Sequence, residues 1–567
     1  MNNQQQSQTE SSSKIARRSP EQVMRLNRLG SFHQSRLSFM RVLTRRLSAE
    51  QWRFDCCEFS IDSNGFGHAV YSAIGPERTY SLVAFAHDLP DELRSDRVIA
   101  EQWDTTFVLF DGVPSAADID RLANNVPKQE AGRLSGTELT LSRANRSVRL
   151  WQHVVDRLAN GQQPDSEQLD SVGYLMRTTA VYGSGKFGAA DRQSIADRDE
   201  CRSPFQVEML TVYLIRTFVR DLVQHVANAR GGEKSVTLDA DIARSLGIGN
   251  STGLGMAPFI LNHPALFHNW IVAREEAIAQ VRSIETVNDK DVDLFLTLYE
   301  RAYNSMKQWG TQHELQKHKV VQLITDLQTL KKHITSVNWQ EARVWDGLYR
   351  WCEQNLELEA QEFLASLMLE PYGDLIDGFC HCMGSESPKI QPIDAAMSVA
   401  GINQIIDKLY GWAKDIDWSA EDANARVWYV SEEKLEPRLG ERFEEPIEPY
   451  EQPLSPARDI MQLRKALEQQ NQLLTLAEFL LKFPQHRHAV RRVQTINALP
   501  YAEIRDNTIA STLLPIDMLR CKLSFFGAIH FDPRSDRWVR IRMFGNAPYP
   551  EELSEQNAEF WAYPASN

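Results

Sequence analysis

The sequence has no apolar run long enough to cross a membrane. Its most apolar segment, VEMLTVYLIRTFVRDLVQHVA, is interrupted by charged residues, so we expect a buried helix in a soluble protein. These charged residues are Glu208, Arg216, Arg220 and Asp221. A secretory signal is missing too, because residues 1–18 contain no apolar stretch. Their polar composition predicts a disordered leader instead.

Cysteine is scarce, with seven residues in a chain of 567. Because the number is odd and the chain is long, we expect no disulfide framework and a reducing compartment, the cytoplasm. The segment FCHCMG offers Cys380, His381 and Cys382 as metal ligands, but a structural zinc site needs a second ligand pair. The sequence supplies no such pair, so we expect no metal and buried free thiols here.

Familiar catalytic motifs are missing as well. The chain has no G-x-S-x-G serine elbow, no H-E-x-x-H zinc helix and no C-x-x-C pair. The sequence therefore names no reaction directly, and the cofactor stays unknown.

Positive charge is in the minority, since the formal net charge is −14 at pH 7. This balance disfavours general binding to nucleic acids or to anionic membranes. The segment DIARSLGIGNST is typical of the first helix and turn of a helix-turn-helix. However, Gly253, Gly255 and Pro258 interrupt the helix that would have to enter DNA. We expect no nucleic-acid partner and no membrane partner.

The residues that are present predict an α+β fold, with a mostly helical middle and antiparallel β-rich segments near both ends. The SPEQ signal at Ser19 predicts a first helix from Pro20 to about Leu47. The same signal, SPFQ at Ser203, predicts the start of the apolar helix. Short β-rich runs over 52–110 predict an antiparallel sheet, and KLSFFGAIHF and RWVRIRMFG predict a final hairpin.

A chain of this length is too long for one hydrophobic core. Shifts in composition divide it into a leader at 1–18, an α+β segment at 19–135, a helical domain at 136–418, an acidic proline-rich arm at 419–456 and a C-terminal helix with a hairpin at 457–567. Hairpins in both β-rich ends open on Phe-Gly, which indicates either an internal duplication or a shared composition. We expect the two ends to associate in one sheet or in two related sheets.

The final hairpin carries three arginines close together, Arg537, Arg540 and Arg542. Arg540 and Arg542 share one face of a strand. Such a pair either binds acidic partners or forms salt bridges, and we favour salt bridges here.

Two glycine-rich segments are the best candidates for a ligand site. The first, YGSGKFG at 182–188, formally satisfies the dinucleotide fingerprint, but no clear βαβ unit surrounds it. One interpretation is that its glycines end a helix and that Lys186 is solvated. The other is that exposed backbone amides beside Arg177, Ser184 and Lys186 bind a carboxylate or phosphate.

The second segment, GIGNSTGLG at 247–255, is expected to open either a short helix or a turn. Asn250, Ser251 and Thr252 would orient an anion there, since amide and hydroxyl groups at a helix start favour negative charge. His263 begins the next helix, where a neutral imidazole suits a general base. A partly buried capping histidine is the simpler interpretation.

If the two segments face each other, His263, Tyr182 and Asp191 are the candidates for proton transfer. The predicted function is a cytoplasmic enzyme that acts on a small anionic metabolite by acid–base chemistry such as elimination or isomerisation. The alternative is a non-catalytic interaction or regulatory protein that works through its helices at 290–366 and its acidic arm at 436–455. Homo-oligomerisation stays open under both hypotheses.

Overall fold

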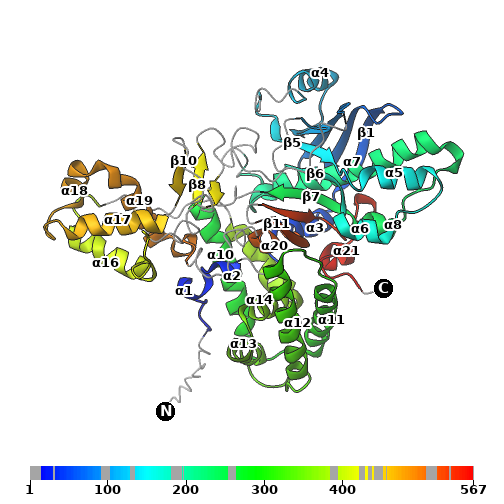
Figure 1. The fold of residues 1–567 in the computed structure, drawn as a ribbon. Helices are drawn as coiled ribbons and strands as arrows, with labels where there is room; N and C mark the ends of the chain where they lie inside the picture. Colours follow the sequence, from blue (N-terminus) through cyan, green and yellow to red (C-terminus); the bar gives the residue numbers. More distant parts are fainter. Residues whose placement is uncertain are drawn as a thin grey trace, which may run out of the picture.

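In the computed structural model, a large mixed sheet and the helices around it lie at one end of the molecule, and a helical lobe lies at the other (Figure 1). The structure describes residues 14–29, 32, 34–90, 102–127, 134–179, 195, 197–252, 263–383, 394–419, 428–431, 437–439, 451–454, 456–505, 520–535 and 538–565. No helix in these ranges is long and apolar enough to cross a membrane.

The sheet has nine strands in the order β1-β2-β3-β4-β5-β6-β7-β12-β11. Their bounds are β1 Arg53–Ile61, β2 Gly67–Ile74, β3 Thr79–Ala86, β4 Thr105–Asp111, β5 Glu138–Arg146, β6 Tyr174–Thr178, β7 Gly247–Thr252, β11 His530–Ser535 and β12 Trp538–Met543. Neighbouring strands are antiparallel except β6 and β7, which run parallel. The predicted α+β fold is confirmed, and β1–β4 form the antiparallel sheet expected near the N-terminus.

The middle of the chain is less uniformly helical than the sequence predicts. β5, β6 and β7 all lie in the segment expected to be helical, and they join β4 to the C-terminal hairpin. β7 also replaces the turn or short helix expected for GIGNSTGLG. It forms a strand because β6 and β12 pair with its two edges, and such pairing outweighs the poor strand propensity of glycine.

The two β-rich ends associate in one sheet, as predicted, because β12 pairs with β7 and β11 pairs with β12. They do so through β5–β7 and not by direct contact with β1–β4. The hairpin is shorter than expected, because α20, Cys521–Ser524, replaces the first part of its first strand. Phe525 and Phe526 pack instead on the rings of Trp270 and Phe39. The internal duplication stays a prediction.

Helix α7, Gln206–Gly231, is the predicted apolar helix, and most of its residues are buried. It packs against strands β2–β7. Phe205 is its N-cap residue, so the start signal expected at Ser203 is wrong. The Ser203 hydroxyl donates instead to the backbone carbonyl of Cys380, and this bond to a distant segment replaces the cap.

The single N-terminal helix expected over 20–47 is wrong. Three helices occupy this region, α1 Pro20–Val23, α2 Leu26–Leu29 and α3 Phe39–Ala49. Between α1 and α2, Arg25 forms a parallel β-bridge with Arg505. At the start of α3, the backbone amide of Phe39 donates to the carbonyl oxygen of Phe525. Bonds to distant backbone therefore interrupt the local helical pattern.

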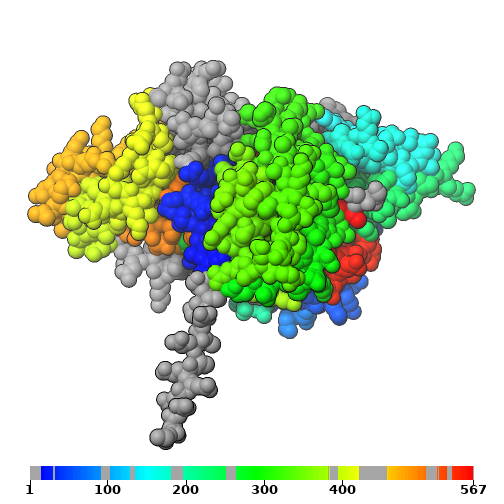
Figure 2. Space-filling model, turned by 90° about the horizontal axis from the view of Figure 1, so that it is seen from below, coloured from blue at the N-terminus to red at the C-terminus, as the bar shows by residue number. Residues whose placement is uncertain are grey.

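Two groups of helices complete the fold (Figures 1 and 2). The first contains α10 Pro264–Arg282, α11 Asp289–Lys307, α12 Glu314–Ile334, α13 Val344–Asn355 and α14 Leu358–Leu367. The second is the lobe of α16 Val399–Tyr410, α17 Pro456–Glu468, α18 Leu476–Lys482 and α19 Arg487–Ala498, which share a hydrophobic core. In Figure 2 the N-terminal segment, in blue, lies between this yellow and orange lobe and the green helices.

The other named helices are short and lie around the sheet or in the connections. They are α4 Ala116–Asn125, α5 Trp151–Ala159, α6 Ser166–Val172, α8 Ala240–Ser245, α15 Gly373–Ile376 and α21 Glu555–Phe560. A separate three-stranded sheet lies within the arm expected at 419–456. Its order is β10-β8-β9, with β8 Trp428–Ser431, β9 Pro437–Leu439 and β10 Glu451–Leu454.

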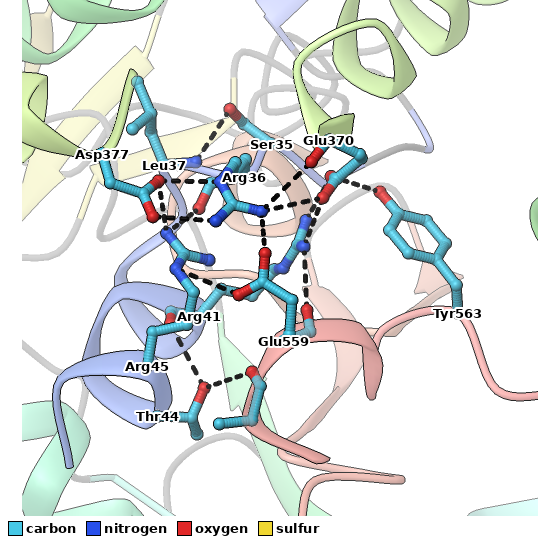
Figure 3. A network of polar contacts seen from close by, with 11 residues as sticks. Ser35, Arg36, Leu37, Arg41, Thr44, Arg45, Glu370, Asp377, Glu559 and Tyr563 are labelled. Carbon is cyan, nitrogen blue, oxygen red and sulfur yellow. Dashed lines mark hydrogen bonds and ion pairs between the residues drawn. The ribbon is translucent and has the colours of Figure 1, made fainter. Parts of the chain in front are cut away.

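Buried ion pairs hold the N-terminal segment to remote parts of the chain (Figure 3). Arg41 of α3 makes two hydrogen bonds to Glu370, at 2.6 and 2.7 Å. Arg36 makes two to Asp377, at 2.7 and 2.8 Å, and it also contacts Glu559 of α21. Because their partners flank α15 or lie in α21, these arginines connect three regions that are far apart in the sequence.

A second buried cluster fixes the start of the chain to α10 and α14. Arg18 donates to Glu275 at 2.7 and 2.8 Å and to Glu362 at 2.6 Å. Burial alone would raise the pKa of Glu362, but the positive charges of Arg18, Arg28 and Arg274 outweigh it and lower the pKa to about 2. Since this folded-state pKa lies below the ordinary 4.5, ionised Glu362 stabilises the fold at neutral pH.

We expect this stabilisation to be lost as the pH falls from about 4.5 to about 2, because protonated Glu362 leaves Arg18 buried with less counter-charge. Glu362→Gln should therefore lower the melting temperature at pH 7. Between pH 4.5 and 2, the melting temperature of this variant should fall less than that of the wild type. Thermal unfolding followed by circular dichroism checks both effects. The control is Glu341→Gln, at an exposed carboxylate. Equal melting curves for the two variants would contradict the expectation.

Candidate functional site

The parallel strands β6 and β7 adjoin the two glycine-rich segments in the sequence. The first segment follows β6, and the second begins with β7 itself. Arg177 of β6 pairs with Gly249 of β7. Since both strands run in the same direction, their carboxyl ends lie at the same edge of the sheet. In the sequence, residues 180–194 and 253–262 follow these two strand ends. The carboxyl ends of parallel strands are a common location for ligand sites in open sheets.

Several of the predicted site residues lie outside the part of the chain that the structure describes. In the first glycine-rich segment and just after it, these are Tyr182, Ser184, Lys186 and Asp191. Ser251 and Thr252 are the last residues of β7, and their side chains also lie outside the described part. The ligand-binding and catalytic roles of these residues stay predictions.

Arg177 and Asn250 lie on adjacent strands, and both side chains are buried. They occupy opposite faces of the sheet, because it is Gly249 that pairs with Arg177. The side-chain amide nitrogen of Asn250 donates to the carbonyl oxygen of Thr178 at 2.9 Å. Asn250 thus ties β7 to the end of β6, and its contact with a ligand stays a prediction.

His263 is the N-cap residue of α10, whose first helical residue is Pro264. The structure corrects the simpler interpretation of this histidine, because its side chain is exposed and makes no hydrogen bond that caps the helix. The role of His263 in proton transfer stays a prediction.

Four arginine side chains share one face of neighbouring strands, which we call the arginine face. Gly249 of β7 pairs with Arg177 of β6 and with Arg542 of β12, and paired residues point to the same face. Arg540 lies two residues from Arg542 and therefore on this face too. On β5, Arg143 lies two residues from the partner of Arg177 and completes the set.

The arginine face points away from α7. On β5, the hydroxyl groups of Thr140 and of Thr211 in α7 are 2.8 Å apart, and Arg143 lies three residues further along the strand. On β12, Val539 and Ile541 alternate with the arginines and are buried in the main hydrophobic core. On β12 the apolar side chains thus lie on one face and the guanidinium groups on the other, whereas on β5 the buried Leu141 shares the face of Arg143.

Two glycines make room for the side chains on this face. A Cβ atom on Gly249 would lie 2.6 Å from the ring of Tyr174, and one on Gly173 would lie 2.0 Å from Cζ of Arg542. Gly173 also has a φ of +73°, a conformation that strains other residues. A side chain at either position would force Tyr174 or Arg542 to move.

The arginine face has unused hydrogen-bonding capacity. Burial lowers the pKa of Arg542; the carboxylate of Asp170 opposes this effect, and the charge of Arg540 adds to it. The Nε atoms of Arg540 and Arg542 have no hydrogen-bond partner within the described residues, while Nη1 of Arg540 donates to the carbonyl of Ser171 at 3.3 Å. Buried donors without acceptors cost free energy, and a carboxylate or phosphate would supply such acceptors.

The sequence located only part of this face. It placed Arg540 and Arg542 together but favoured salt bridges for them, and neither forms an ion pair with any described residue. Arg143 was missed because β5 lies in the segment expected to be helical. Alternation of apolar and polar residues in ELTLSRANR was the available signal for a strand there.

The thiols of FCHCMG differ from one another. Cys380 is buried, as expected, and burial raises the pKa of its thiol to about 12. Cys382 is exposed, which corrects the expectation for this residue, because the short helix Asp377–Met383 places it at the surface. Among the residues that the structure describes, no group of three or more His, Cys, Asp and Glu side chains could hold a metal ion.

No protein-family model matches the chain, and no curated protein or solved structure is significantly similar to it.

We expect Gly249→Ala to destabilise the protein, because the added methyl group collides with the ring of Tyr174 beside β7. Overpacking of this kind costs about 1–3 kcal/mol, and chemical denaturation measures the loss. The control is Gly347→Ala in α13, where a Cβ atom meets open space and alanine is the better helix former. A Gly249→Ala variant as stable as the wild type would contradict the close approach of β6 and β7.

Proposed function

We propose that the chain is an enzyme that binds a small metabolite with a carboxylate or phosphate group at the arginine face. One observation carries this proposal: the Nε donors of Arg540 and Arg542 lack acceptors among the described residues. A guanidinium group presents a planar fork of donors that matches two oxygen atoms of a carboxylate or phosphate. An anion between these side chains would fill the unused donors.

Two other buried arginines differ from Arg540 and Arg542, because they form ion pairs with carboxylates of the chain. Arg18 and Arg41 are fully buried beside Glu275 and Glu370, which neutralise their charges. The stability of the fold by itself favours such internal pairing, because a buried charge without a partner lowers the free energy of unfolding. The face around Arg542 departs from this pattern, as expected of a site that takes its counter-charge from a ligand.

The position of the face also supports binding near the predicted catalytic residues. Arg177 lies one residue before the end of β6, and the segment with Tyr182, Lys186 and Asp191 begins shortly after it. A ligand held by the arginines would therefore lie close to the starts of both glycine-rich segments. Guanidinium groups would also stabilise negative charge that develops on the ligand during acid–base chemistry such as elimination or isomerisation.

Inorganic phosphate and succinate are suitable probes of this site. We expect both to raise the melting temperature of the wild type, and Arg542→Met to weaken their binding tenfold or more. A hydrogen bond to a charged group contributes roughly 1.5–3 kcal/mol, and about 1.4 kcal/mol corresponds to a factor of ten. Isothermal titration calorimetry measures the affinity.

The control for this experiment is Arg487→Met, which removes an exposed arginine of α19 and changes the net charge equally. This variant should bind both probes like the wild type. Unchanged affinity in Arg542→Met, or an equal loss in Arg487→Met, would refute the proposed site.

A further inference from the structure

A second feature of the molecule, which shares no residue with the arginine face, is a large cleft. Its volume is about 1320 Å³, and its walls come from the end of α3 and the turn after it, from α11, from residues 370–377 and from residues 550–560. Sites for small ligands usually measure about 300–1000 Å³. The cleft is therefore large enough for several side chains of a peptide.

One wall of the cleft is formed by the ion network of Figure 3. Its arginines, Arg36, Arg41 and Arg45, face an equal number of carboxylates. The carboxylates are Glu370, Asp377 and Glu559. Since cations and anions balance, this network adds no net charge to the cleft. It also holds the wall in place, because its members come from residues 36–45, from the two sides of α15 and from α21.

The remaining charged residues of the cleft are all acidic. Asp291 of α11, Asp374 of α15 and Glu555 of α21 line it from three separate elements. Asp374 and Glu555 are exposed, and none of the three forms an ion pair with a residue that the structure describes. The cleft therefore carries a surplus of negative charge.

Apolar side chains lie among these carboxylates. Leu375 is 45% exposed and lines the cleft next to Asp374. Half-buried Leu294, Leu553 and Phe560 line it as well. An apolar centre with a charged rim is the usual arrangement of a protein-binding surface.

We propose that this cleft is the docking site for an extended basic segment of a partner protein. Lysine or arginine side chains of that segment would pair with Asp374, Glu555 and Asp291, and its apolar side chains would cover Leu375. Charge complementarity selects a basic partner over an acidic one, since like charges across an interface are repelled. The proposal does not depend on the anion site, because the two sites share no residue.

A fluorescein-labelled nonapeptide of alternating lysine and leucine tests the proposal, with fluorescence anisotropy measured on the full chain at 0.15 M salt. We expect binding to the wild type and at least a tenfold loss of affinity in the double variant Asp374→Lys/Glu555→Lys. Both positions are exposed, so the fold should be retained, and an unchanged melting temperature verifies this. The matched peptide of glutamate and leucine should bind the double variant better than the wild type.

The control variant Asp293→Lys/Glu233→Lys replaces two exposed acidic residues outside the cleft with lysine. It changes the net charge by the same amount as the double variant of the cleft. It should bind the basic peptide like the wild type. Three results would overturn the proposal: no peptide binding to the wild type, an equal loss in the control variant, or complete displacement of the peptide by an equal concentration of spermine. The last result would assign the cleft to small polycations.

Discussion

The parallel pairing of β6 with β7 is the contact on which the rest of the structure depends. It joins the antiparallel strands of the N-terminal half to the C-terminal hairpin, so that one sheet contains both β-rich segments. It also sets the register that brings Arg177, Gly249 and Arg542 to the same face. A slip of one residue would turn every side chain of β7 to the opposite face, with Asn250 among the arginines.

The two faces of the sheet satisfy different requirements. The face towards α7 is closed by apolar packing, with few polar contacts such as that between Thr140 and Thr211. The other face carries a second apolar cluster, on β2–β5 against Leu122 of α4, and the four arginines on β5, β6 and β12. Elsewhere in the protein, Arg18 is buried together with Glu275 and Glu362, while buried Arg216 donates to backbone carbonyls. The buried cation of Arg18 thus stabilises the fold, whereas under our proposal the cations of the arginine face bind a ligand.

The sequence predicted those elements whose local pattern agrees with the tertiary structure. The apolar run of α7, the alternating strands β1–β4 and the final hairpin all belong to this class. Prediction failed where distant partners determine the conformation. Arg25 is not helical, because it forms a β-bridge with Arg505. The glycines of β7 form a strand because the strands on both sides pair with it.

The candidate site was harder to predict than the fold, for the same reason. The sequence indicated Arg177 as a ligand-binding residue and noted the shared face of Arg540 and Arg542. Their common position follows only from the strand order, in which residues more than 350 apart in the sequence become neighbours. A parallel strand pair brings such residues together without any local sequence signal.

The most direct test of the anion site is anomalous diffraction from crystals of the protein grown with selenate, a tetrahedral divalent anion. If the arginine face binds anions, an anomalous selenium peak will lie within hydrogen-bond distance of the guanidinium groups of Arg540 and Arg542. A face that holds no selenium at saturating concentration, with both guanidinium groups paired to carboxylates of the chain, would contradict the assignment.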